Sequence, residues 1–146
     1  MGILDVVIVI FIILEFANVV ILYFIPDSKI GNGVAVFNQW FKSKEDESSE
    51  LFAKYMASWV AGTKLIFVAL LLVILFMGDE RIKFVTVIVM ILSISTYYFK
   101  LDKIIKKIDS RGELSPKGYS KTLFLMITAF ILMFVVSLIV YIINLL

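Results

Sequence analysis

Four long apolar stretches constrain this chain more than any other feature of its sequence. They cover about residues 3–25, 55–77, 82–99 and 122–146. A helix needs roughly 20 mostly apolar residues to cross a hydrocarbon core about 30 Å thick, and each stretch is of this order. Because open strands leave their backbone polar groups unsatisfied in lipid, the spans are expected to be helices. The sequence therefore predicts an all-α membrane protein, a four-helix transmembrane bundle forming one domain over residues 1–146.

The composition agrees with this class and excludes several kinds of chemistry. Hydrophobic residues make up 62% of the chain and its mean hydropathy is +1.04, whereas soluble domains are usually about 45–50% apolar. The chain has no cysteine and no histidine, which removes thiolate nucleophiles, disulfides and histidine-based catalysis or metal binding. No catalytic residue, metal or cofactor is predicted, and the chain is not expected to be an enzyme. Its basic residues form no nucleic-acid-binding motif, so no nucleic-acid partner is expected.

The positions of the basic residues predict an orientation. Apart from Lys64, which lies inside the second stretch, eleven Lys and Arg residues fall in the connections 26–54 and 100–121, and only Arg81 and Lys83 fall on the opposite side. Since cytoplasmic loops carry an excess of Lys and Arg, both connections are predicted to be cytoplasmic and both termini outside. The lysine- and isoleucine-rich composition, without glycosylation sequons, favours a prokaryotic plasma (inner) membrane.

The first connection is expected to hold a short helix, over about residues 34–42, at the membrane surface. Phe37, Trp40 and Phe41 stand at the i, i+3, i+4 spacing of one helical face. An aromatic face of this kind is typical of a helix at the headgroup level, so these side chains are predicted to face lipid. Farther along, Ser48 or Ser49 is expected to cap a helix that begins before the second span.

The second connection is expected to extend the third span as an amphipathic helix. Its apolar residues recur at helical spacing, and its other face carries lysines: Lys100, Lys103, Lys106 and Lys107. Ordinary positive-inside topology explains these lysines, and the alternative is that they bind anionic lipid headgroups. Ser115 and Pro116 are expected to open the fourth helix as its N-cap and first-turn proline.

Two charged residues lie inside the spans, where an ionised side chain costs about 2.5–3.5 kcal/mol on insertion scales. Glu15 lies ten residues before the end of the first stretch, and Lys64 nine residues after the start of the second. At about 1.5 Å per residue, both lie roughly 14–15 Å from the same end of their antiparallel helices. The two are therefore predicted to form a buried pair. Small residues beside Lys64, namely Ala57, Ala61 and Gly62, let a neighbouring helix approach closely.

Further polar residues near mid-membrane are candidates for the same buried site: Asn18, Ser93, Thr96 and Thr128. The polar groups gather at mid-bilayer and in the cytoplasmic half, which favours a pocket open to the cytosol over a polar path across the membrane. Three interpretations remain open. The pair fixes which helices associate, or it binds a small polar ligand or relays a proton or ion, or the span boundaries are misplaced and one charge reaches the surface.

The preferred functional interpretation is a non-enzymatic membrane protein, an accessory subunit that acts through lipid or protein contacts. Its expected partners are anionic lipid headgroups on the cytoplasmic side, with a membrane protein or a second copy of the chain as further candidates. The alternative is a small transporter or ion-coupled carrier that uses Glu15 and Lys64. A water-filled pocket of roughly a few hundred Å³ that reaches Lys64 would favour a carrier or an enzyme, and a dry, close-packed centre would favour the accessory subunit.

Overall fold

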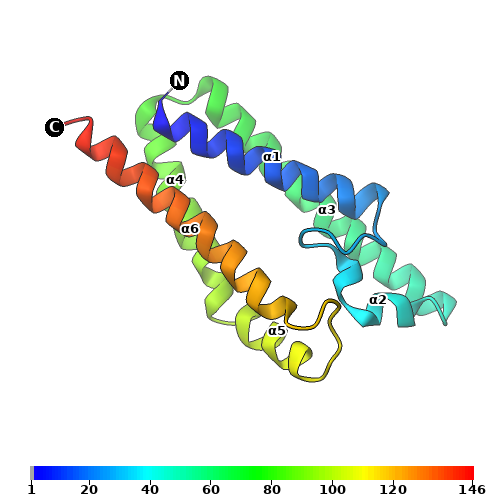
Figure 1. The fold of residues 1–146 in the computed structure, drawn as a ribbon. Helices are drawn as coiled ribbons and strands as arrows, with labels where there is room; N and C mark the ends of the chain where they lie inside the picture. The colour runs from blue at the N-terminus through cyan, green and yellow to red at the C-terminus, as the bar shows by residue number, and fades with distance from the viewer. Residues whose placement is uncertain (1) are drawn as a thin grey trace.

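The computed structural model describes residues 2–146. All regular secondary structure elements in this range are helices (Figure 1). The long helices are α1 (Ile3–Phe24), α3 (Glu47–Met77), α4 (Glu80–Ser95) and α6 (Tyr119–Ile143). The short ones are η1 (Val34–Val36), α2 (Asn38–Ser43), η2 (Thr96–Tyr98) and α5 (Leu101–Ser110). Helices α1, α3 and α6, and the helical stretch from Glu80 to Ser110, are each long and apolar enough to cross a membrane. The prediction of an all-helical chain with four such segments is confirmed.

The long helices are arranged as two antiparallel pairs. Helix α1 packs mainly on α3, α4 packs mainly on α6, and α1 joins the pairs through contacts with α6 and α4. Figure 1 shows the two chain termini at one end, which we call the terminal end, and α2 and α5 at the opposite end, which we call the linker end.

An apolar core joins all four long helices in the terminal half of the molecule. Phe11 of α1 lies at its centre, with its ring centroid 6.0 Å from that of Phe67, 5.1 Å from Phe130 and 5.4 Å from Phe134, all in edge-on arrangements. Such edge-to-face packing is favourable for aromatic rings. The fully buried Phe134 belongs to this core. The terminal half is therefore closed by close packing.

At the linker end, residues 28–38 of the first connection lie between the two helix pairs; we call this segment the inner linker. Val34 packs against the α1–α3 pair through Val19 and Ala61. Val36 is fully buried in a cluster with α5 and α6 side chains, including Ile105 and Leu123. The inner linker thus holds apart two helix pairs that contact each other directly at the terminal end.

The start of α3 corrects one expectation from the sequence. Its N-cap is Asp46 rather than Ser48 or Ser49, because the Asp46 carboxylate accepts the backbone N–H of Ser49 at 2.9 Å and the Ser49 hydroxyl at 2.7 Å. A carboxylate there also interacts favourably with the positive end of the helix. With 31 residues, α3 is roughly 46 Å long and extends beyond a core about 30 Å thick.

The start of α6 is a second correction. Ser115 and Pro116 precede the helix, and its N-cap is Gly118, whose φ of 82° lies in the left-handed region that glycine adopts readily. Asp109 of α5 accepts the backbone N–H groups of Gly118 at 3.0 Å and Ser120 at 3.1 Å. The capping acceptor thus comes from a different helix, which local sequence patterns do not reveal.

Two predicted helices are also interrupted. The helix expected over residues 34–42 is divided at Phe37, whose backbone is extended and forms a bridge with Leu114. The extension of the third span is a separate helix, α5, because η2 and the non-helical Lys100 end the preceding helix. At Phe37 the contacts of the inner linker with the second connection replace continuous helix, as in the hydrogen bond from Ser115 N to Val36 O at 2.8 Å.

Candidate functional site

Glu15 and Lys64 meet between α1 and α3, about midway along α1. The Lys64 ammonium donates to Glu15 Oε2 at 2.7 Å and to Asn18 Oδ1, also at 2.7 Å. Ala61, one turn from Lys64, is fully buried against α1, which lets the two helices approach closely. We call Glu15, Asn18 and Lys64 the polar triad. Its contacts agree with the pairing expected from their matched depth.

The polar triad is not sealed inside the protein. The side chains of Lys64 and Glu15 are 24% and 18% exposed. A cavity of about 510 Å³ lies beside them, with walls from α1, α6 and the inner linker, and we call it the α1–α6 cavity. Its apolar walls include Leu14, Met126 and Phe130. A largely apolar cavity with a few convergent polar groups is the usual form of a small-molecule site.

A second, larger hollow reaches Lys64 from the linker end. It has a volume of about 770 Å³ and lies between α3, α2 and the inner linker, with Phe52, Met56 and Val60 among its walls. Asn32 of the inner linker borders both this hollow and the α1–α6 cavity. Sequence reasoning did not single out Asn32, although its place between Gly31 and Gly33 marks a tight turn.

The other predicted site residues lie elsewhere. Ser93 and Thr96 border a separate cavity of about 390 Å³ beside α5. The Thr128 hydroxyl lies 2.7 Å from the Tyr98 hydroxyl, and it also donates to the Phe124 carbonyl at 2.8 Å. The structure thus corrects the expectation of one buried polar site. Residues at a similar height along antiparallel helices can lie on different faces of those helices.

The sequence analysis also missed a second ion pair on α1. Asp5 Oδ1 lies 2.7 Å from Lys83 Nζ of α4, and their side chains are only 11% and 12% exposed. The backbone N–H of Gly2 donates to Asp5 Oδ2 at 2.8 Å. Both residues lie at span ends, where charges are common, so no local signal marked them as partners. This pair ties α1 to α4 at the terminal end and borders none of the cavities described above.

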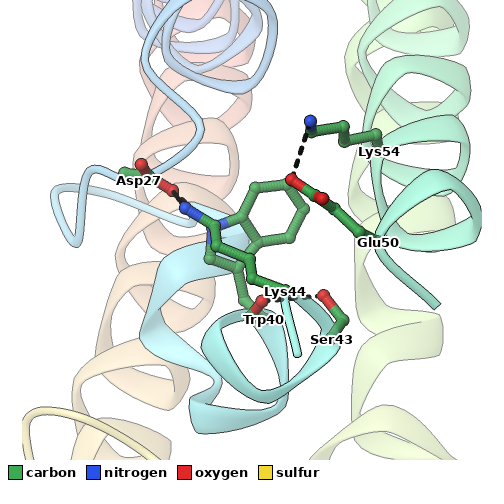
Figure 2. A network of polar contacts seen from close by, with 6 residues as sticks. All are labelled: Asp27, Trp40, Ser43, Lys44, Glu50 and Lys54. Carbon is green, nitrogen blue, oxygen red and sulfur yellow. Dashed lines mark hydrogen bonds and ion pairs between the residues drawn. The ribbon is translucent and has the colours of Figure 1, made fainter. Parts of the chain in front are cut away.

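The three aromatic residues of the first connection have different environments. Trp40 is buried against Ala35 and Ala57, which corrects the expectation that it faces lipid. Figure 2 shows why: its indole N–H donates to Asp27 Oδ1 at 2.7 Å, beside the Lys44 ammonium. Phe37 is half-buried beside the cluster of Val36, and Phe41 is exposed. Of the three rings, that of Phe41 is the most exposed, and the Lys29 and Lys44 ammonium groups each lie 5.5 Å from its centre.

The Asp27 contacts predict how the linker end responds to acid. Hydrogen bonds from Lys44 and then from Trp40 hold the pKa of the Asp27 carboxyl below its ordinary value of 3.8. A carboxyl whose pKa is lowered in the folded state stabilises the fold at pH values above its ordinary pKa. This contribution to stability is lost as the pH falls through the lowered pKa. We therefore expect the Trp40 fluorescence of a Trp59→Phe variant to stay constant from neutral pH to about pH 4 and to change only at lower pH.

A matched control is available at the same position. In Asp27→Asn the side chain keeps an acceptor for Trp40 but loses the titrating group, so the acid transition should disappear. A fluorescence transition centred well above pH 4, or one that survives in Asp27→Asn, would show that another group controls the Trp40 environment.

The predicted lipid-binding lysines are all on the surface. Lys100, Lys103, Lys106 and Lys107 are exposed. Lys106 is also engaged within the protein, since it lies 2.7 Å from Asp102 and 5.3 Å from the centre of the Phe124 ring. Within residues 2–146, no group of three or more acidic side chains is placed to hold a metal ion. Comparison with protein-family models, curated proteins and solved structures finds no match to this chain.

Proposed function

We propose that this chain is a non-enzymatic membrane protein that binds a small amphiphilic molecule at the polar triad, as a binding protein or carrier. One observation carries the proposal: the Glu15–Lys64 pair forms part of the wall of the α1–α6 cavity, whose other walls are mostly apolar. Such a cavity takes the apolar body of a ligand, and the triad takes its polar head. An ion pair that served only to join α1 and α3 would gain nothing from an adjacent cavity.

The closed terminal half supports a carrier that opens toward one side. The core around Phe11 joins all four helices toward the terminal end, whereas the α1–α6 cavity and the larger hollow that reaches Lys64 extend toward the linker end, where the inner linker separates the helix pairs. A ligand would enter from the linker end or from the bilayer beside α1 and α6. Passage to the opposite side would require the terminal core to open.

The second candidate remains an accessory subunit that acts through lipid or protein contacts. The observation in its favour is α5, which exposes Lys103 and Lys107 beside Leu101 and Ile104. A helix of this kind suits an anionic membrane surface. Replacing the α5 lysines by glutamine should then reduce co-purification of anionic lipids and leave ligand retention at the polar triad unchanged.

Binding at the triad can be tested by native mass spectrometry of the protein released from its own membrane. The Glu15→Gln/Lys64→Met double variant keeps the site neutral but removes both charges. We expect it to retain about tenfold less of the co-purified amphiphile, the effect of losing roughly 1.4 kcal/mol of charge-assisted hydrogen bonding. The matched control is Asp5→Asn/Lys83→Met, which removes the other ion pair of α1 and should leave retention unchanged. Equal retention in both double variants would contradict the proposal.

The orientation proposed for the chain places the linker end in the cytoplasm and both termini outside an inner membrane. It is supported by the excess of Lys and Arg in the two connections. Single cysteines at Ser48 and at Ser110 should resist a membrane-impermeant thiol reagent in intact cells, whereas a cysteine at Leu146 should react. The cysteine-free chain supplies its own background control. Reaction at Ser48→Cys or Ser110→Cys from outside would reverse the orientation.

A further inference from the structure

The Asn18 side chain carries a donor that has no partner. Its Oδ1 accepts from the Lys64 ammonium at 2.7 Å. An ammonium group can only donate, so the amide oxygen must be the atom that faces Lys64 and the amide nitrogen must point away. That nitrogen, Nδ2, is buried and has no hydrogen-bond acceptor within residues 2–146, and Asn18 as a whole is only 8% exposed. Buried polar groups without partners are rare in native proteins, so this one points to an absent acceptor.

The unpaired donor lies at the border of the α1–α6 cavity. A Cβ atom placed on Gly31 of the inner linker would lie 3.8 Å from Asn18 Nδ2, so the Gly31 turn covers the donor. Asn18, Gly31 and Asn32 all contribute to the cavity wall. Gly31 and Asn32 are themselves exposed, and the turn is held by a hydrogen bond from the Tyr119 hydroxyl to Gly31 O at 2.7 Å. The Gly31 turn therefore separates Nδ2 from the cavity, and a ligand atom can reach this donor only if the turn moves.

The charge of the site selects among possible head groups. Glu15 and Lys64 are the only ionisable side chains in the wall of the α1–α6 cavity, and they neutralise each other. An anionic or cationic head group would add an uncompensated charge within apolar surroundings, which is strongly unfavourable. A neutral head group carries no such cost, and an acceptor oxygen on it supplies what Asn18 Nδ2 lacks.

We infer that the ligand of the α1–α6 cavity is a neutral amphiphile whose head group presents an acceptor oxygen, such as a ketone, ester or amide carbonyl, to Asn18 Nδ2. This inference rests on the proposed function and specifies its ligand class. The oxygen takes the place beside Nδ2 that the Gly31 turn now covers. The apolar chain lies along α6, against Met126, Phe130 and Met133.

Three photoactivatable probes with the same alkyl chain test the assignment: a methyl ketone, a carboxylate and a primary amine. Each is added to the full-length protein in nanodiscs, and labelling of α1 and α6 peptides is measured by mass spectrometry. We expect the ketone to label these peptides most strongly. Asn18→Leu, which removes the donor, should reduce ketone labelling about tenfold, the effect of one hydrogen bond to a buried donor. Thr63→Val is the matched control, because its hydroxyl donates within α3 to Trp59 O and lies outside this cavity.

The Asn18→Asp variant distinguishes a direct contact with the head group from a merely structural role of Asn18, because only a direct contact would change which probe is preferred. It keeps an acceptor for Lys64, removes the N–H donor and adds a carboxylate, so labelling should shift from the ketone to the amine. Unchanged ketone labelling in Asn18→Leu, or stronger labelling of the wild-type protein by the carboxylate or the amine, would overturn the head-group assignment while leaving binding at the cavity intact. Absence of cavity labelling by all three probes would instead contradict the proposed function.

Discussion

Replacing either Glu15 or Lys64 alone should lower the melting temperature of the purified protein markedly, and replacing both should restore much of the loss. Each single change leaves an unpaired ionisable group in an apolar setting, which typically costs roughly 3–5 kcal/mol for a buried pair. Since the two side chains are 18% and 24% exposed, we expect values toward the lower end. Melting temperatures of Glu15→Gln, Lys64→Met and the double variant, in one detergent and at one pH, form the required double-mutant cycle.

The second ion pair of α1 supplies a control for this cycle. Asp5 and Lys83 join α1 to α4 at the terminal end, so Asp5→Asn combined with Lys64→Met should give simply additive losses. If the effects of Glu15→Gln and Lys64→Met are themselves additive, the two residues are energetically independent. Glu15 and Lys64 would then not act together as parts of one polar triad.

Docking of the inner linker should depend strongly on Val36. This side chain is fully buried among apolar residues of α5, α6 and the second connection. Val36→Asp would bury a carboxylate without a partner, which we expect to destabilise the docked linker by more than about 3 kcal/mol. The expected results are a large fall in melting temperature and rapid tryptic cleavage after Lys29, which is exposed but held by a hydrogen bond to Ser115 Oγ at 2.9 Å.

Ile30→Asp is the matched substitution in the same segment. Ile30 is 73% exposed, so a carboxylate there stays hydrated and should change the melting temperature little. Similar losses in the two variants would mean that the linker tolerates no charge at all, and slow cleavage in Val36→Asp would show that its attachment does not depend on the Val36 cluster.

Features that repeat along the chain, or that depend on distance along one helix, could be predicted from the sequence. Apolar stretches of about 20 residues have few alternatives to a membrane-spanning helix, and the structure has four helices long and apolar enough to cross a membrane. The meeting of Glu15 and Lys64 was predictable for a related reason. Depth along a straight helix is proportional to residue number, and two consecutive spans are antiparallel.

The tertiary structure alone decided which faces of these helices meet. In a membrane protein, side chains that face lipid and side chains that face the core are both apolar, so periodicity does not distinguish the two faces. This is why Ser93 and Thr96 were expected at the polar triad and instead border another cavity. It is also why the contact of Asp5 with Lys83 could not be foreseen.

The first connection, which includes the inner linker and α2, shows the same limit. Its local pattern indicated an aromatic face for lipid, but the burial of Trp40 and Val36 depends on surfaces of α3, α5 and α6 that are distant in sequence. The cavity beside the polar triad likewise exists because this linker separates two helix pairs that touch at the other end. By itself the sequence determined the number of helices long and apolar enough to cross a membrane and the positions of Glu15 and Lys64 along them, because both follow from residue spacing. The cavity and the unpaired Asn18 donor were decided by long-range packing, which spacing does not encode.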